Sequence, residues 1–212
     1  ELKLIANLVN KDQISVDIGA NLGLFTHFMS KASKHVFAFE PNPYPLQNLK
    51  QLVDKNVTIL PIALGNFNGP TEIKIPHHAN GWSSNGASMS PKTKEPGKFI
   101  NIQCRKLDSL NLENIGLIKI DVEGFEIEVL KGARKILLKN KPAMIIENEV
   151  VHTEDTSELF LIMEELGYKK YICSSEGKLK IINDFSVEVN QKDANNKDID
   201  YIQNYIFICK EV

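Results

Sequence analysis

The chain has 212 residues, 42% of them hydrophobic, and a formal net charge of −2 at pH 7. This length supports one domain with a sizeable core, the weak charge gives no indication of a nucleic-acid partner, and no apolar run reaches the roughly 20 residues of a membrane span. Three widely spaced cysteines, Cys104, Cys173 and Cys209, lie in apolar runs, as free thiols in a reducing compartment do, so we expect a cytoplasmic protein.

Strand and helix signals alternate along the first third of the chain. The sequence ISVDI at 14–18 indicates a short apolar strand, and residues 22–32 carry apolar side chains at helical spacing. HVFAF at 35–39 indicates a second strand. A proline-rich start then leads into a helix over about 43–53, and VTIL at 57–60 indicates a third strand.

A pair of strands of different character follows. Residues 71–75 and 99–104 alternate apolar and polar side chains, which predicts a hairpin or edge strands. Between them lies a stretch rich in Gly, Ser, Pro and Asn at 76–98, and loops of this length are usually lids or binding loops. We therefore expect an insertion over about 71–104 within a single domain that covers 1–212.

The alternation resumes in the second half of the chain. One helix is expected from Gly124 through Leu137, and a second from a capping pattern at Asp155 and Glu158 to Gly167. Short apolar runs indicate strands at 117–121, 143–147, 168–173 and 203–209. Together these elements predict an α/β protein with a mostly parallel sheet that is covered by helices on both faces.

Acidic side chains stand at the ends of four of these expected strands. They are Asp17, Glu40, Asp121 and Glu147. Ligands of open parallel sheets bind beyond the carboxyl ends of the strands. We therefore expect these four carboxylates to surround one pocket.

The turn after the first strand indicates which ligand the pocket takes. Asp17, Gly19, Asn21 and Gly23 do not match the G-x-G-x-x-G pattern of dinucleotide sites, although Glu40 stands where an acid can bind a ribose. S-adenosylmethionine fits better, because its ammonium can pair with Asp17 and its carboxylate with backbone N–H groups at the helix start. A nicotinamide-dependent oxidoreductase and a binding domain without turnover are the alternatives.

Several motifs give a more specific indication. In order between Val16 and Glu149 occur VDIGANLGLF, FAFEPNP, LPIALGN, LIKIDVEGFEIEVLKGA and AMIIENE. Together they resemble the FkbM-type family of S-adenosylmethionine-dependent methyltransferases. The resemblance implies a Rossmann-like class I methyltransferase fold, with a seven-stranded sheet whose last strand is antiparallel. It also implies transfer to oxygen, often a hydroxyl of a small molecule, sugar or glycan.

The resemblance also implies roles for individual residues. Glu40 would bind the ribose and Asp121 would lie beside the methyl donor. The methionine end would be held by Asp17, Gly19, Asn21 and Gly23. The expected cofactor site is completed by Ala20, Pro41 and Ala63.

Methyl transfer from a sulfonium needs alignment and exclusion of water, and a hydroxyl acceptor also benefits from a base within reach. The candidate bases are Asp121, Glu123, Glu147 and His152, although Glu123 would equally suit a helix cap and Glu147 a solvated strand end. A divalent ion bound by oxygen ligands is a weaker alternative, since no spacing demands a metal. Its ligands would be Asp121, Glu147, Asn148 and Glu149.

In the long loop, His78, Trp82 and Ser84 are the candidates for contact with the acceptor.

Overall fold

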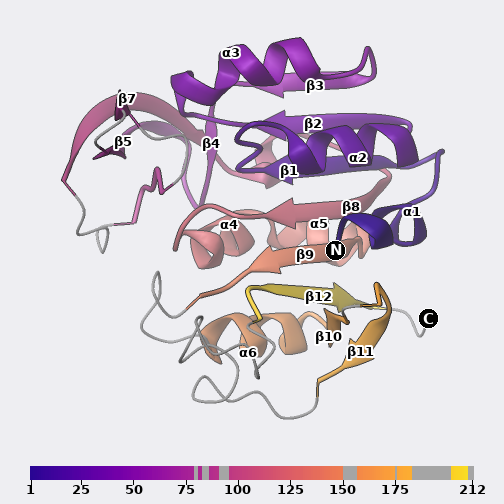
Figure 1. Ribbon diagram of the computed structural model, residues 1–212. Helices are drawn as coiled ribbons and strands as arrows, with labels where there is room; N and C mark the ends of the chain where they lie inside the picture. The colour runs from indigo at the N-terminus through magenta and orange to yellow at the C-terminus, as the bar shows by residue number, and fades with distance from the viewer. Residues whose placement is uncertain are drawn as a thin grey trace.

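The computed structural model describes residues 1–78, 81–82, 86–90, 96–149, 157–174, 176–182 and 202–209. A large β-sheet runs through the molecule (Figure 1). Its strands are β1 (Ile14–Ile18), β2 (His35–Phe39), β3 (Val57–Leu60), β8 (Ile115–Ile120), β9 (Ala143–Glu147), β10 (Lys169–Cys173), β11 (Leu179–Ile181) and β12 (Asn204–Ile208).

The order of these strands is β11-β10-β12-β9-β8-β1-β2-β3. The five strands from β3 to β9 pair in parallel, whereas β12 is antiparallel to both β9 and β10. The seven strands expected from the sequence are therefore all present, and the last one is antiparallel. Within the described part of this sheet, the edge strand β11 was missed, and it is short and partly exposed.

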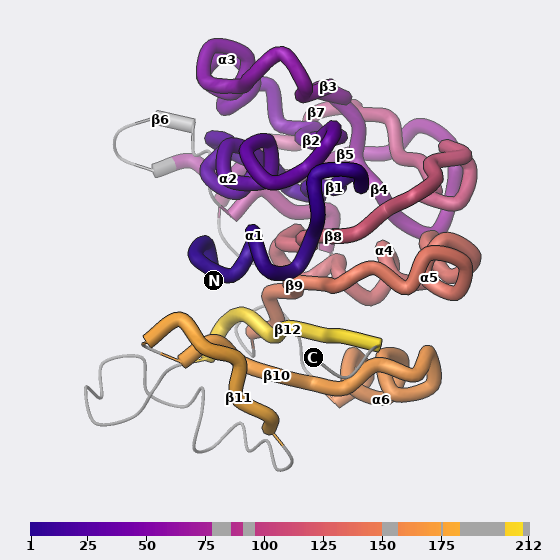
Figure 2. The backbone as a smooth tube through the Cα atoms, turned by 90° about the vertical axis from the view of Figure 1, so that its right-hand side faces the viewer, coloured from indigo at the N-terminus to yellow at the C-terminus, as the bar shows by residue number. Residues whose placement is uncertain are grey.

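Helices cover both faces of this sheet (Figure 2). One face carries α1 (Ile5–Leu8), α2 (Leu24–Ala32) and α3 (Pro43–Leu52), and the other carries α4 (Glu126–Gly132), α5 (Arg134–Asn140) and α6 (Ser157–Glu165). Two short 3-10 helices, η1 (Leu2–Leu4) and η2 (Leu107–Ser109), complete the helical elements of the described residues. Separate apolar clusters fill the two sides, so the central strands are buried from both faces.

The single helix expected from Gly124 to Leu137 is divided in two at Ala133, and that expectation was wrong. Glycine weakens a helix interior, and Gly132 here lies against another backbone segment. A Cβ added to Gly132 would stand 1.9 Å from the carbonyl oxygen of Gly65. The second helix then begins at a cap of its own, because Asp108 accepts hydrogen bonds from the first backbone N–H groups of α5.

The expected hairpin is present and stands beyond the carboxyl ends of the parallel strands (Figure 1). It consists of β5 (Gly69–His78) and β7 (Gly97–Arg105), which are antiparallel. The short strands β4 (Ala63–Leu64) and β6 (Gly81–Trp82) pair with β7 and β5 respectively. The backbone of residues 86–90 also joins β5, since Lys74 and Ser88 form a β-bridge. This hairpin is therefore placed to cover whatever binds at the end of the sheet.

The three cysteines are free, as expected, and Cys104 is buried while the other two are partly buried. Among the described residues, no helix has the length and apolar character that crossing a membrane requires.

Candidate active site

A cavity of about 340 Å³ lies where the parallel strands β1, β2, β8 and β9 end, and the hairpin forms its opposite wall. This volume falls in the range of small-molecule sites. From the hairpin side the wall is made by Ile73, Gly86, Ala87 and Met89. Eight of the residues expected from the sequence also line the cavity. They are Gly19, Asn21, Glu40, Pro41, Ala63, Asp121, Glu123 and Glu147.

Other expected residues are not on this wall. Asp17, near the end of β1, and Ala20 and Gly23, in the turn after it, do not line the cavity. The side chains of His78 and Trp82, and the whole of Ser84 and His152, lie outside the described residues. Their expected roles therefore stay predictions.

The turn after β1 brings two strand ends unusually close together. Gly19 has a φ of +79°, and a Cβ at this position would lie 1.8 Å from the carbonyl oxygen of Asp121. The N–H groups of Gly19 and Ala20 both donate to the carbonyl of Phe39. Glycine is required here by conformation and by space, and the close approach places the ends of β1 and β8 side by side in the cavity floor.

Glu40 follows β2, and its carboxylate is held by two backbone N–H groups. Oε2 accepts from Asn21 at 2.8 Å, and Oε1 accepts from Asn42 at 2.7 Å. Burial raises the pKa of Glu40 to about 7, against the lowering effect of these two donors. Each carboxylate oxygen has a second acceptor site. The side chain can therefore receive two further hydrogen bonds from a pair of neighbouring hydroxyl groups.

Asp17 lies behind the cavity, with its side chain fully buried. Its Oδ2 accepts a hydrogen bond from the Thr26 hydroxyl at 2.5 Å, and its Oδ1 lies 3.9 Å from Nζ of Lys119. Burial raises the pKa of Asp17, and Lys119 and Thr26 act in the opposite direction. These contacts join β1, α2 and β8 beneath the turn, so in this structure Asp17 supports the turn from below.

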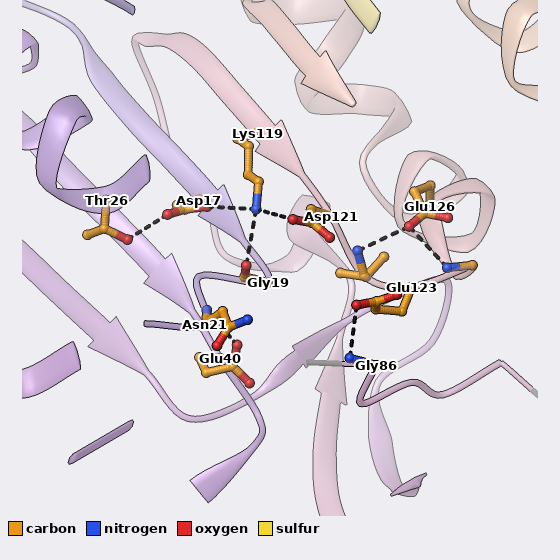
Figure 3. Close-up of polar contacts among 12 residues, drawn as sticks. Asp17, Gly19, Asn21, Thr26, Glu40, Gly86, Lys119, Asp121, Glu123 and Glu126 are labelled. Carbon is orange, nitrogen blue, oxygen red and sulfur yellow. Dashed lines mark hydrogen bonds and ion pairs between the residues drawn. The ribbon is translucent and has the colours of Figure 1, made fainter. Parts of the chain in front are cut away.

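The turn between β8 and α4 carries two acidic side chains, Glu123 and Glu126, that make different contacts. Glu126, which is buried, accepts hydrogen bonds from the N–H groups of Val122 and Gly124 and so holds the turn that precedes α4. Glu123, with a φ of +55°, reaches the hairpin instead. Figure 3 shows Glu123 directed toward Gly86 and Glu126 directed back into its own turn.

Asp121 and Glu147, at the ends of β8 and β9, form a hydrogen-bonded carboxyl pair on the cavity wall. Burial, followed by the hydrogen bond and the negative charge of Asp121, raises the pKa of Glu147 to about 10. Asp121 also makes an ion pair with Lys119, whose Nζ lies 2.8 Å from Oδ2. The raised pKa of Glu147 and the ion pair of Asp121 with Lys119 together favour a carboxyl pair that holds one proton, with the negative charge on the side of Lys119.

Glu149 also lines the cavity, and Asn148 and Glu149 are both buried. No cluster of His, Cys, Asp and Glu among the described residues has the arrangement of a metal site.

Sequence reasoning missed Lys119, Glu126 and Ser88. The signal for Lys119 was available, because a cation in the middle of the apolar run LIKI, in a strand expected to be buried on both faces, requires a buried partner. Ser88 carried no such signal, since its hydroxyl donates to the carbonyl of Glu123 across a tertiary contact.

Comparisons with known proteins point to methyltransferases. A family model described as the methyltransferase FkbM domain matches residues 17–170. The hexuronic acid methyltransferase AglP of Haloferax volcanii is 29% identical over 165 residues, which are 74% of this chain and 65% of that protein. The 2-O-methyltransferase NoeI of Sinorhizobium fredii is 26% identical over 162 residues, which are 66% of this chain and 65% of that protein. The chain thus spans slightly less than two thirds of the length of either relative.

Solved structures show the same fold. A methyltransferase FkbM from Methylobacillus flagellatus has a TM-score of 0.54 at 16% identity, covering 98% of this chain and 50% of that one. A methyltransferase from Streptococcus mutans, in complex with SAH, has a TM-score of 0.52 at 13% identity, covering 98% of this chain and 93% of that one.

Proposed function

Because this chain belongs to the FkbM methyltransferase family, we propose that it transfers a methyl group from S-adenosylmethionine to a hydroxyl group of a sugar or glycan. The observation that carries the proposal is a single cavity that joins Glu40 to the Asp121–Glu147 pair. The first group suits a ribose, and the second suits a reacting hydroxyl. The names of AglP and NoeI support a sugar as the acceptor.

The residues present fit the donor. Glu40 has acceptor sites left for the two ribose hydroxyls, and Gly19 and Asn21 of the neighbouring turn line the same cavity. Phe39, Ile62 and Leu64 supply an apolar wall beside these polar groups. When bound, the donor supplies a methyl group on a positively charged sulfur, and the neutral thioether that leaves needs no proton.

The protein's own contribution is to align the acceptor, remove its proton and exclude water. Asp121 is the proposed base, because its carboxylate makes the ion pair with Lys119 and lies on the cavity wall. As the acceptor oxygen forms its bond to the methyl carbon and the carbon–sulfur bond breaks, the hydroxyl proton passes to Asp121. From there it leaves to solvent after the product departs.

The acceptor would lie between the carboxyl pair and the hairpin. Glu123 and Glu149 offer acceptors for sugar hydroxyls on one side, and Ala87 and Met89 offer an apolar surface on the other. Contacts with His78, Trp82 and Ser84 belong to this proposal as well. The free thiols support a reducing compartment, such as the cytoplasm, as the place of action.

Two measurements test the proposal. Calorimetric titration with S-adenosylmethionine and S-adenosylhomocysteine should show binding, and titration with NADH should not. Labelled methyl groups should then appear on the hydroxyls of a panel of neutral, amino-sugar and uronic-acid glycosides. Binding of NADH alone would favour an oxidoreductase, and cofactor binding without transfer to any glycoside would favour a binding domain.

A further inference from the structure

Lys119 is a buried cation in the middle of the strand β8, with 3% of its surface exposed. All six residues of β8 are buried, as expected for a central parallel strand. An ammonium group in such a place is costly unless several groups compensate it. The groups that contact the Lys119 ammonium must therefore compensate its burial.

The ammonium lies at the junction of the two halves of the cavity floor. Nζ makes an ion pair with Asp121 at 2.8 Å, donates to the carbonyl of Gly19 at 3.2 Å and lies 3.9 Å from Oδ1 of Asp17. Figure 3 shows Lys119 between Asp17 and Asp121, with Gly19 below it. The ring of Phe25 stands 5.0 Å from Nζ on the helix side. One side chain thus touches β1, the turn after it, α2 and the end of β8.

The charges around this group indicate which state it holds. Burial by itself would lower the pKa of Lys119, but the carboxylates of Asp121 and Asp17 raise it above its ordinary value. The ammonium consequently stays charged inside the protein. The titratable groups that face it, or face its partner Asp121, are Asp17, Glu40, Glu126 and Glu147, and Glu123 and Glu149 in turn face Glu147. Among these groups, Lys119 is the cation that faces both Asp17 and Asp121.

Resting on the proposed function, we infer that Lys119 is a positioning residue which keeps Asp121 ionised for proton removal and fixes the donor-binding turn through the carbonyl of Gly19. Asp121 is the group that reaches the cavity, and Lys119 acts through it. Without the ammonium, the carboxyl pair of Asp121 and Glu147 would take up a second proton. The base and the turn would then also lose the common hydrogen-bond donor that sets their relative position.

Carbon-13 NMR of the labelled aspartate and glutamate carboxyl groups tests this inference in the protein without cofactor. In the wild-type protein at pH 7, the signal of Asp121 should be that of a carboxylate and the signal of Glu147 that of a protonated acid, each assigned by loss in D121N and E147Q. In K119M, which keeps an unbranched chain without charge, the protonation midpoint of Asp121 should rise by about 1 to 3 pH units. Lys139→Met, at an exposed lysine, should leave both signals unchanged.

A purely structural role for Lys119 would give a different result. K119M would then unfold at lower temperature while the Asp121 signal kept its wild-type pH dependence, and that outcome overturns the inference. If K119M does not fold, the wild-type spectrum alone tests the inference. A protonated Asp121 beside an ionised Glu147 in that spectrum would overturn it. These spectra need no ligand, so failure of the proposed function, seen as absent S-adenosylmethionine binding, is distinguished from failure of the inference.

Discussion

The carboxylate of Glu123 accepts a hydrogen bond from the backbone N–H of Gly86 at 2.9 Å, across 37 residues of sequence. The carbonyl of the same glutamate accepts from the hydroxyl of Ser88 at 2.6 Å. Two bonds therefore attach the 86–90 segment to the turn that follows Asp121. Since Ala87 lines the cavity, the position of the acceptor wall depends on this attachment.

Glu123→Ala should release the 86–90 segment without affecting the donor half of the cavity. A hydrogen bond to a charged group contributes about 1.5–3 kcal/mol, so the amide of Gly86 should exchange its hydrogen at least tenfold faster. The affinity for S-adenosylhomocysteine should stay within about twofold of wild type. Glu128→Ala, on the partly exposed face of α4, is the matched control and should change neither quantity. Unchanged exchange at Gly86 in Glu123→Ala would remove Glu123 as the attachment point.

The raised pKa of Glu40 should make ribose binding depend on pH. The side chain can accept hydrogen bonds from both ribose hydroxyls at its two oxygens only when it is ionised, because one oxygen of the neutral acid is a donor. Its pKa in the ligand-free protein is about 7. Affinity for 5′-methylthioadenosine, which lacks the titrating amino-acid tail, should therefore rise between about pH 6 and pH 8 and then level off. Glu40→Gln should bind at least about tenfold more weakly at pH 8, with a flat profile.

The matched control for this experiment changes the ligand. The 2′-deoxy form of 5′-methylthioadenosine lacks one hydroxyl, so its affinity should be lower at pH 8 and should rise less with pH. Calorimetry in buffers of different ionisation enthalpy should also show proton release when the complete ribose binds near pH 7. Equal profiles for the two ligands would place the ribose away from Glu40.

Glu147 should make the folded protein less stable as pH rises. Its pKa is raised to about 10 in the folded state, far above the value of an unfolded glutamate, so the folded state binds more protons over the interval between them. The free energy of unfolding therefore falls from about pH 4.5 toward pH 10 through this group. Glu147→Gln should be near wild type in urea denaturation at pH 5 and more stable than wild type at pH 9. Glu176→Gln, at an exposed site, should track wild type at both values.

The sequence predicted the main sheet well because its signal is local. The bounds of β1, β2, β3 and β9 coincide with apolar runs that end at turn residues or acids. The division of the expected helix at Ala133 was not visible, since it accompanies the contact of Gly132 with Gly65 and a cap from Asp108, both distant in sequence. Periodicity reports which face of a helix is apolar, and it does not report which backbone that face will meet.

The candidate site was predicted in part for a similar reason. Acids at strand ends identify the cavity, because parallel strands bring their carboxyl ends to one edge. The register between neighbouring strands determines which of these acids faces the cavity and which lies behind its wall. Asp17 and Lys119 are opposite partners in the pairing of β1 with β8, and this places the Asp17 carboxylate beside an ammonium rather than on the cavity wall. An interpretation of the turn that omits Lys119 assigns the Asp17 carboxylate to the ligand, although in the structure this carboxylate lies beside the Lys119 ammonium.

Gly19→Ala should separate the steric requirement of the turn from its conformational one. The new Cβ would stand 1.8 Å from the carbonyl of Asp121, so the ends of β1 and β8 would have to move apart, and Gly19 also has a φ of +79°. Gly167 has a similar φ of +82° with no atom within 4 Å of an added Cβ, which makes Gly167→Ala the matched control. The control should cost about 1–2 kcal/mol for the left-handed conformation alone. Gly19→Ala should cost at least about 4 kcal/mol and abolish S-adenosylhomocysteine binding. Equal losses of unfolding free energy in the two variants, measured by urea denaturation, would show that the approach of Gly19 to Asp121 is not what requires glycine there.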